Sequence, residues 1–143
     1  MAGLILGYMM TINEQIDAFL EGKVFAVVGA SKDRNKYGNK VLRCYLQHGL
    51  KVYAVNPKEK EIEGQVCVPD LASLPEPVHG VSVITPPHIT ETIVAQAAEV
   101  GIQHVWMQPG AESERALDLG DELGLNVIGD GSCLLVVLGY KEQ

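Results

Sequence analysis

The sequence has 143 residues, 47% of them hydrophobic, which suits a single domain able to bury about 70% of the surface that its unfolded chain exposes. The net charge of −7 argues against a nucleic-acid-binding protein, and the apolar opening at residues 3–10 is far too short to span a bilayer. The three cysteines lie far apart with no CxxC pair, so neither a disulfide framework nor a zinc site is indicated, and we expect a reducing, cytoplasmic setting.

The charges are distributed unevenly along the chain. Nine of the eleven Lys and Arg residues, but only two of the eighteen acids, lie between Lys23 and Lys60, so this segment carries +7 and the remainder −14. A positive segment in an acidic protein suits a small polyanion. The alternative is that these cations only solvate a surface helix and its neighbours.

The first predicted element is a short helix that follows a loosely held tail, residues 1–10. Thr11 and Glu14 have the spacing of a capping box, in which each side chain bonds the other residue's backbone N–H. Apolar residues then recur on one helical face, at Ile12, Ile16, Phe19 and Leu20. We expect Gly22 to end this helix in the left-handed conformation.

A buried strand that runs directly into a glycine loop is predicted next. Five apolar residues, 24–28, precede Gly29-Ala30-Ser31, and residues 41–46 have the apolar spacing of a helix packed on a sheet, ended by Gly49. Residues 50–55 form a second strand, which Asn56-Pro57 stops because proline cannot donate to a central ladder.

The pattern weakens between residues 58 and 78. Residues 62–64 and 66–68 indicate a short strand or turn, and residues 71–74 a single helical turn, so we expect no strand of the main sheet in this segment. Three further strands are predicted at residues 81–84, 104–107 and 125–128, with helices between them that Gly101 and Gly124 end. Residues 134–138 are expected to add an edge strand or a covering turn.

Strands and helices thus alternate along the whole chain. Near-continuous apolar strands joined by helices predict an α/β fold: one doubly wound, mainly parallel sheet of five to six strands with helices on both faces. No linker or repeat marks a boundary, so residues 1–143 are predicted to be a single domain.

The carboxyl ends of the strands are where an open parallel sheet binds its ligand. Gly29 permits close approach of the backbone to an anion, Ser31 adds a hydroxyl donor, and the next helix directs its free amides to the same place. This predicts a phosphate site, with Arg34 in the same positive loop. The loop lacks the GxGxxG pattern, and only Gly38 is placed to serve the close-packing role of a later glycine.

The end of the second strand discriminates between coenzymes. A NAD-binding domain usually has an acid there for the ribose diol, whereas this chain has Asn56-Pro57-Lys58. Lys58, or Lys51 at the other end of the strand, could pair with a ribose phosphate. The pattern therefore favours a phosphorylated adenosine over NAD, and leaves NADP open.

Four blocks at strand ends resemble a known family: residues 27–31, 55–58, Thr85-Pro86-Pro87, and 105–110, which end in Gln108-Pro109-Gly110. The chain resembles the stand-alone CoA-binding domain proteins, whose fold is shared with the CoA-binding domain of the succinyl-CoA synthetase α subunit. The resemblance implies a Rossmann-like fold that binds CoA at these ends.

The resemblance also implies a path for the coenzyme. Gly29, Ala30 and Ser31 would line the pyrophosphate, and Val55, Pro57 and Lys58 the adenosine 3′-phosphate. Thr85, Pro86 and Pro87 would line the adenine or pantetheine, and Gln108, Pro109 and Gly110 the far wall. Family members often carry Asp-Arg-Cys near the C-terminus, whereas this chain has Asp130-Gly131-Ser132-Cys133.

Three hypotheses for function follow. The first is a binding module that takes CoA or an acyl-CoA as a carrier, sensor or regulator, without catalytic activity of its own. The second is an NADP(H)-binding oxidoreductase or redox sensor. The third is a non-catalytic subunit that completes a CoA ligase with a separate partner protein, because the ligases of this fold phosphorylate a histidine in another domain and we expect no such domain here. Pairing of two copies into a homodimer is left open.

Overall fold

The computed structural model describes residues 10–142, so the predicted tail lies outside the described residues except for Met10. The helices are α2 (Ile12–Leu20), α3 (Tyr37–Gln47), α4 (Pro87–Glu99), α5 (Glu114–Glu122) and α6 (Leu134–Leu138), with a 3-10 turn η1 (Leu71–Ser73). The strands are β1 (Val24–Val28), β2 (Lys51–Val55), β3 (Glu61–Ile62), β4 (Gln65–Val68), β5 (Gly80–Val83), β6 (His104–Met107) and β7 (Asn126–Ile128). The alternation predicted from the sequence is confirmed.

The strands form one sheet in the order β3-β4-β2-β1-β5-β6-β7, parallel except for β3, which pairs antiparallel with β4. The sheet thus has seven strands in the described residues instead of five to six. The expectation that residues 58–78 hold no main-sheet strand is wrong, because β4 extends the parallel ladder through the pairs Ala54↔Cys67 and Val55↔Val68. Two paired residues give too short an apolar run to stand out in a sequence.

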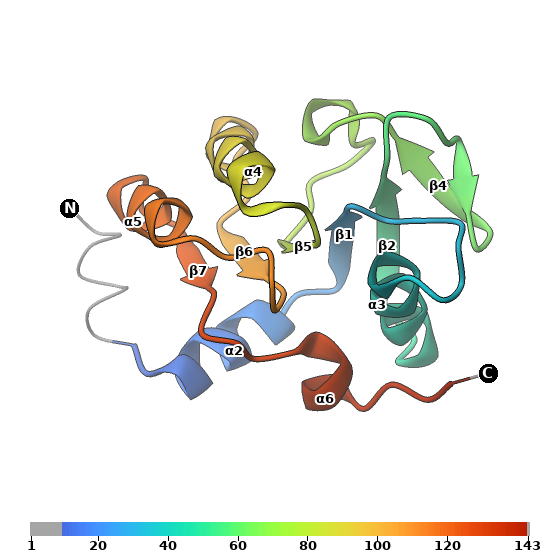
Figure 1. Ribbon diagram of the computed structural model, residues 1–143, viewed down its shortest axis with the longest axis horizontal. Coiled ribbons are helices and arrows are strands. Elements are labelled where there is room, and N and C mark those ends of the chain that lie inside the picture. Colours follow the sequence, from blue (N-terminus) through green and yellow to red (C-terminus); the bar gives the residue numbers. More distant parts are fainter. Residues whose placement is uncertain (1–9, 143) are drawn as a thin grey trace.

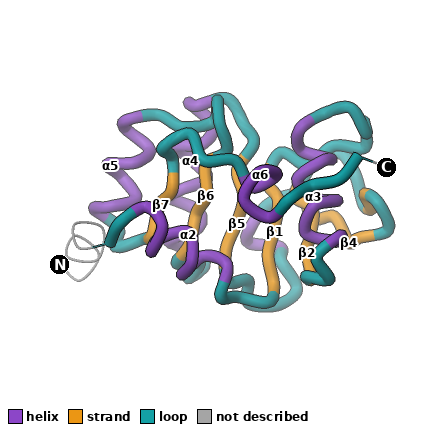
Figure 2. Tube along the Cα trace, turned by 90° about the horizontal axis from the view of Figure 1, so that it is seen from below, coloured by secondary structure: helices purple, strands orange, loops and turns teal. Residues whose placement is uncertain are grey.

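Helices cover both faces of the sheet. Figure 1 shows α4 and α5 on one face and α2, α3 and α6 on the other, and Figure 2 looks onto the second face, with the strands side by side behind these helices. Phe25 and Val27 of β1 pack on the α2/α3/α6 side, whereas Ala26 and Val28 pack on the α4/α5 side. This period of two explains why the central strands are apolar throughout.

The first helix begins as predicted but ends differently. Thr11 Oγ1 accepts from the Glu14 N–H at 3.2 Å and the Thr11 N–H donates to Glu14 Oε1 at 3.1 Å, which confirms the capping box. Glu21 ends α2 in the right-handed conformation, and Gly22 is not left-handed. A Cβ at Gly22 would lie 2.1 Å from Cγ of His79, so this glycine is required for close packing, and the predicted left-handed ending is wrong.

Residues 134–138 form the short helix α6 and not an edge strand. Its first residue, Leu134, is fully buried against the α2/α3 side of the core, so this segment covers the sheet. Among the helices of residues 10–142, none combines the length and the apolar character that crossing a membrane demands.

Candidate functional site

The topology places a crevice at the carboxyl ends of β1 and β5. From β1 the chain passes through α3 on one face to β2, and later through α4 on the opposite face from β5 to β6. The strand order therefore reverses between β1 and β5, the switch point at which open α/β sheets bind ligands. The segments that follow β1, β2, β5 and β6 carry most of the residues that the sequence singled out.

Two glycines close the turn between β1 and α3 tightly against β5. Gly29 has φ +91°, and a Cβ there would lie 2.0 Å from the Ile84 carbonyl oxygen. A Cβ at Gly38 would lie 2.1 Å from the Gly29 carbonyl oxygen, so the close-packing role predicted for Gly38 is confirmed. Backbone alone fits here, and this leaves the loop amides accessible to a ligand.

The loop after Gly29 leads into a helix start without a side-chain cap. Ser31 Oγ accepts from the Asp33 N–H at 3.1 Å and thereby tightens the loop. The N-cap residue of α3, Lys36, makes no side-chain capping bond. The Asn39 N–H donates to the Lys36 carbonyl at 3.1 Å, whereas the Tyr37 and Gly38 N–H groups have no acceptor within residues 10–142 and keep their capacity to bind an anion, which the helix dipole favours.

Asn56 joins the end of β2 to this loop. Its Nδ2 donates to the buried Ala30 carbonyl at 2.9 Å, and its Oδ1 accepts from the Lys58 N–H at 2.8 Å. The amide thus fixes the loop on one side and the turn carrying Lys58 on the other. The proline that follows Asn56 leaves no N–H to compete for the same oxygen.

A mainly apolar pocket of about 320 Å³ lies beside the glycine turn. Five predicted site residues line it: Gly29, Val55, Asn56, Pro57 and Thr85. The other lining residues were not among the predicted site residues: Val28, Pro69, Asp70, Leu71, Ile89, Thr92, Ile93 and Gln96.

Ile89 shows how the pocket differs from the core. It shares the apolar stripe of α4 with Ile93, which suggests a core position, yet it remains 40% exposed and lines the pocket from the first turn of the helix. An apolar residue two positions after a Pro-Pro helix start, one turn ahead of the buried part of the stripe, is the signal that could have identified it.

A second pocket of about 330 Å³ lies on the other side of Thr85. It is lined by Ile84, Thr85, Pro86, Pro109, Gly110 and Ala111, so it brings the predicted segments after β5 and β6 together. Thr85 lines both pockets, and its Oγ1 lies 2.7 Å from Thr90 Oγ1 of α4. Pro87, the first residue of α4, is exposed beside them.

Gln108 precedes the segment from Pro109 to Ala111 that lines the second pocket, and its side chain is fully buried. Its Oε1 accepts from the Leu134 N–H at 3.0 Å and from the Tyr37 hydroxyl at 3.2 Å, so it joins β6 to the first residues of α3 and α6. The Tyr37 hydroxyl also contacts Sγ of Cys133, and burial raises the pKa of this hydroxyl well above its ordinary value. Gln108 therefore positions elements around the site from behind.

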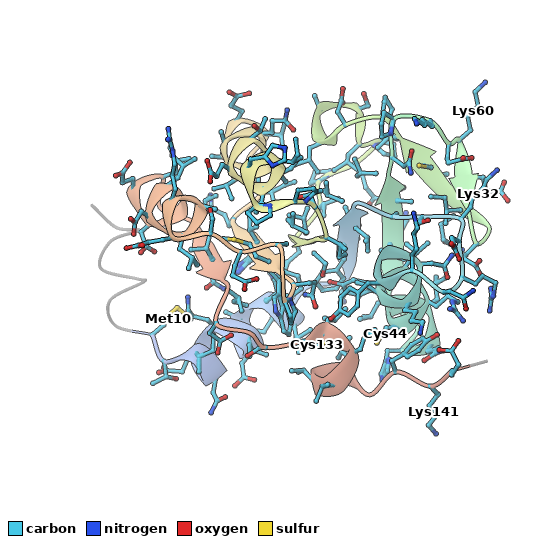
Figure 3. The ribbon with its side chains drawn as sticks, in the orientation of Figure 1. Met10, Lys32, Cys44, Lys60, Cys133 and Lys141 are labelled. Carbon is cyan, nitrogen blue, oxygen red and sulfur yellow. The ribbon has the colours of Figure 1, made fainter. Side chains whose placement is uncertain are left out.

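The cysteines near the site are free thiols. Cys133 lies at the start of α6 and Cys44 on α3 (Figure 3). Burial, with a smaller effect of Cys133, raises the pKa of Cys44 to about 11, which makes it an unreactive core residue. Within residues 10–142, no three His, Cys, Asp or Glu side chains are grouped so that they could hold a metal ion.

Several cations of the positive segment are already paired. Lys32 Nζ lies 2.8 Å from Glu59 Oε2, and Arg34 pairs with Glu63 in the β3–β4 turn. Lys32 and Lys60 project from this side of the molecule (Figure 3). The net charge of +7 therefore overstates the free positive charge at the site.

Lys58 and Lys51 lie on opposite sides of the sheet along the strand direction: Lys58 at the carboxyl edge, where the parallel strands end, and Lys51 at the amino edge, where they begin. Lys58 is exposed beside the site and takes part in none of the ion pairs among residues 10–142. Lys51 begins β2 at the amino edge and pairs with Glu76, so the structure does not bring it together with the other site residues.

Asp70, an acid that lies near the site, was not among the predicted site residues. Asp70 follows β4 and lines the first pocket, and its Oδ1 accepts from the Ser73 N–H at 3.0 Å and from Ser73 Oγ at 2.8 Å. Its carboxylate caps η1, in contrast to the free acid that NAD-binding domains place at the end of the second strand.

Comparison with known proteins identifies the family. The family model for a CoA binding domain matches residues 23–138. The chain is 30% identical over 123 residues to ADP-forming acetate–CoA ligase I of Archaeoglobus fulgidus, covering 78% of this chain and 18% of that protein. It is 26% identical over 125 residues to the α subunit of ADP-forming acetate–CoA ligase II of Pyrococcus furiosus, covering 80% and 27%. The chain thus spans less than a third of these relatives.

A solved structure of similar size has the same fold. A hypothetical protein from Pyrococcus horikoshii superposes with a TM-score of 0.82 at 30% identity, covering 90% of this chain and 89% of that one. The family match spans every strand of the described sheet and all the candidate site residues. The protein therefore belongs to the CoA-binding domain family.

Proposed function

We propose that this protein binds CoA across the crevice at the carboxyl ends of β1, β2, β5 and β6. The observation that carries the proposal is the juxtaposition of an apolar pocket with an uncapped, glycine-started loop, which share Gly29. A nucleotide needs both: an apolar slot for the base and backbone amides for the phosphates.

The adenosine end of CoA fits the first pocket. The exposed Ile89, with Val55 and Pro57, offers apolar surface to a planar base. The pyrophosphate then lies at the loop from Gly29 to Ser31 and the first turn of α3. Lys58, exposed and outside the ion pairs of the described residues, supplies positive charge for the 3′-phosphate.

The pantetheine arm extends past Thr85 into the second pocket. Thr85 and Pro86 form one wall, and Pro109 and Gly110 the other, with Gln108 holding this wall from behind. Pro87 borders the path at the start of α4. Asn56 supports this route by bonding the Ala30 carbonyl and the Lys58 N–H. Two predicted site residues lie outside it: Lys51 is at the opposite edge, and the guanidinium of Arg34 is paired with Glu63.

The biological role we propose is that of a coenzyme-holding module. Acting alone, such a module would be a carrier, sensor or regulator of CoA or an acyl-CoA. The similarity to the α subunit of an acetate–CoA ligase supports a second candidate, a CoA-binding part that works with a partner protein to complete a ligase.

Isothermal titration calorimetry of ligand-stripped protein tests the coenzyme assignment. We expect CoA to bind more tightly than NADP⁺, and NAD⁺ to bind weakest, because the site offers a free lysine but no free acid at the end of β2. Acetyl-CoA in a parallel titration shows whether the second pocket admits an acyl group. Tighter binding of NADP⁺ than of CoA would overturn the proposal in favour of a redox protein.

A further inference from the structure

Two side chains of α3 hold the loop between β1 and α3 from behind. Asn39 Nδ2 donates to the Ser31 carbonyl at 2.8 Å, and Arg43 Nη2 donates to the Arg34 carbonyl at 2.7 Å. Arg43 Nε donates in turn to Asn39 Oδ1 at 2.6 Å, so the two side chains act as one unit. Both are buried, one helical turn apart on the same face of α3.

The hydrogen bonds to the loop carbonyls also determine the directions in which the loop N–H groups point. The peptide bonds of the described residues are trans, so each C=O and the N–H after it point in opposite directions. Because Asn39 binds the Ser31 carbonyl, the Lys32 N–H points away from Asn39. Because Asn56 binds the Ala30 carbonyl, the Ser31 N–H points away from Asn56.

These two N–H groups are available to a ligand. Neither the Ser31 N–H nor the Lys32 N–H donates to an acceptor within residues 10–142, whereas the Asp33 and Asn35 N–H groups are used inside the loop. Successive free N–H groups in a turn form a concave donor site for phosphate oxygens. The direction in which they point therefore decides whether the loop can receive an anion.

Arg43 is buried at an energetic disadvantage. The side chain is 4% exposed, and its Nη1 finds no hydrogen-bond partner in the part of the chain that the structure describes. An unmet buried donor on a charged group destabilises a fold, so a purely structural position would favour an apolar residue. An arginine at this position therefore fits a role in holding the loop.

Glu63 adds a second strained feature to the same cluster. It has φ +51°, the left-handed region, and is the one non-glycine residue there among residues 10–142. From this position its Oε2 accepts from Asn39 Nδ2 at 3.2 Å, while Oε1 pairs with Arg34. Strained backbone of this kind persists where the surrounding structure requires the side chain in one place.

We propose that Asn39 and Arg43, supported by Glu63, are positioning residues that aim the Ser31 and Lys32 N–H groups at the pyrophosphate of the bound coenzyme. This inference rests on the proposed CoA site and deepens it. The cluster touches the loop and not the ligand, and it sets the affinity by organising the loop before the anion arrives.

Arg43→Lys is the primary test. Lysine keeps the positive charge, but its single ammonium group cannot serve the Asn39 and Arg34 acceptors with the planar geometry of a guanidinium. We expect CoA to bind about tenfold more weakly by calorimetry, equivalent to about 1.4 kcal/mol. In ¹H–¹⁵N NMR titrations with inorganic pyrophosphate, the shifts of the Ser31 and Lys32 amides should shrink in the same variant.

Glu142→Gln is the matched control. Glu142 Oε1 lies 3.8 Å from Arg43 Nη2, so this change removes the ion pair of Arg43 and leaves its bonds to Asn39 and to the Arg34 carbonyl intact. Affinity for CoA should stay within about twofold of wild type, since an exposed ion pair contributes little. An equal loss in Glu142→Gln and Arg43→Lys would show that the charge environment of Arg43 matters and its loop bonds do not, and would overturn the proposal.

Glu63→Asn keeps the test decisive if Arg43→Lys fails to fold. Asparagine adopts the left-handed conformation readily, but its shorter side chain withdraws the acceptor from Asn39. We expect the melting temperature to hold within about 2 °C while CoA affinity falls about threefold. Unchanged affinity in the folded variants would overturn the positioning role. If wild-type protein fails to bind CoA, yet pyrophosphate still shifts the two amides and the variants lose that response, the coenzyme assignment fails and the positioning role stands.

Discussion

The amino edge of the sheet, where the parallel strands begin, and the carboxyl edge, where they end, differ in how the space beyond the strands is filled. At the amino edge, side chains fill the space under α2: the rings of His79 and His104 stack at 4.3 Å, and Phe19 lies edge-on to His104. At the carboxyl edge, glycines and prolines leave two pockets and a loop with free N–H groups. Side chains therefore fill the space at the amino edge, whereas at the carboxyl edge residues with small or rigid side chains leave space for a ligand.

From this difference we expect the amino edge to contribute mainly to stability and the carboxyl edge to the proposed coenzyme binding. His79 Nε2 bonds the Ala18 carbonyl at 2.9 Å and Lys51 pairs with Glu76, so these ionisable groups fasten the amino edge. Lys58 has a comparable charge but lies beside an open pocket. Substitutions at the two edges should therefore separate loss of stability from loss of coenzyme binding.

Gly29→Ala should have the largest effect on the carboxyl edge. The new Cβ would lie 2.0 Å from the Ile84 carbonyl oxygen, a backbone atom that cannot move aside, at a φ of +91°. We expect the free energy of unfolding to fall by about 3 kcal/mol, measured by urea denaturation, together with loss of CoA binding.

Gly110→Ala separates strain from steric clash. Gly110 has a similar φ, +96°, but a Cβ there meets nothing within 4 Å. Only the cost of the left-handed conformation remains, about 1 kcal/mol. Equal destabilisation of the two variants would show that the tight β1–α3 turn against β5 is not what makes Gly29 necessary.

Charge reversal at Lys58 and Lys51 compares the two edges directly. Lys58→Glu should weaken CoA binding about tenfold or more, and dephospho-CoA binding much less, because only the former carries the 3′-phosphate. Lys51→Glu should lower the melting temperature by placing two acids together at Glu76, while leaving CoA affinity within about twofold. Equal losses for CoA and dephospho-CoA in Lys58→Glu would remove the proposed 3′-phosphate contact.

Most of the sheet was predictable because its signal is local. Each long strand is an apolar run bounded by a nearby glycine or proline, so its position can be predicted from residues that are close in sequence. Residues 62–64 and 66–68 indicate a short strand or turn, and the structure has the strands β3 and β4 there. Their membership of the main sheet was not predictable because β4 joins β2 through only two residue pairs, and because Val66, the second residue of β4, is 55% exposed. Gly22 was assigned the wrong role because its requirement comes from His79, which lies far along the chain.

The candidate site was predictable to a similar extent. Most of its predicted residues follow the carboxyl ends of strands, and parallel pairing brings these ends to one edge; Lys51, which begins β2, lies at the opposite edge and was the wrong choice. Asp70 and Leu71 were missed because they reach the pocket only through β4. The pairing of Arg34 with Glu63 was likewise invisible, because it depends on where the hairpin lies in space.

The smallest effect expected is a pH dependence that originates at the amino edge. His104 Nδ1 lies 2.9 Å from Asn126 Nδ2, so it accepts a hydrogen bond that only an unprotonated nitrogen can make. Burial, followed by the neighbouring His79, lowers the pKa of His104 to about 4. The unfolded chain takes up this proton near pH 6.5 and the folded chain only near pH 4, so stability should fall as the pH decreases between these values and level off below them.

His104→Gln isolates this contribution from the carboxylates that titrate in the same range. Glutamine can still accept from Asn126 but carries no proton to exchange. Because His104 is only half-buried and its charge is partly screened, the wild type should lose about 1 kcal/mol more than the variant between pH 6.5 and pH 4, well below the full linkage value. Urea unfolding of both proteins at the two pH values measures the difference. CoA affinity should change little in the variant at either pH, because His104 is the first residue of β6 and lies at the edge opposite the proposed coenzyme site. A variant that bound CoA as weakly as Lys58→Glu would contradict the division of the molecule into a stabilising edge and a binding edge.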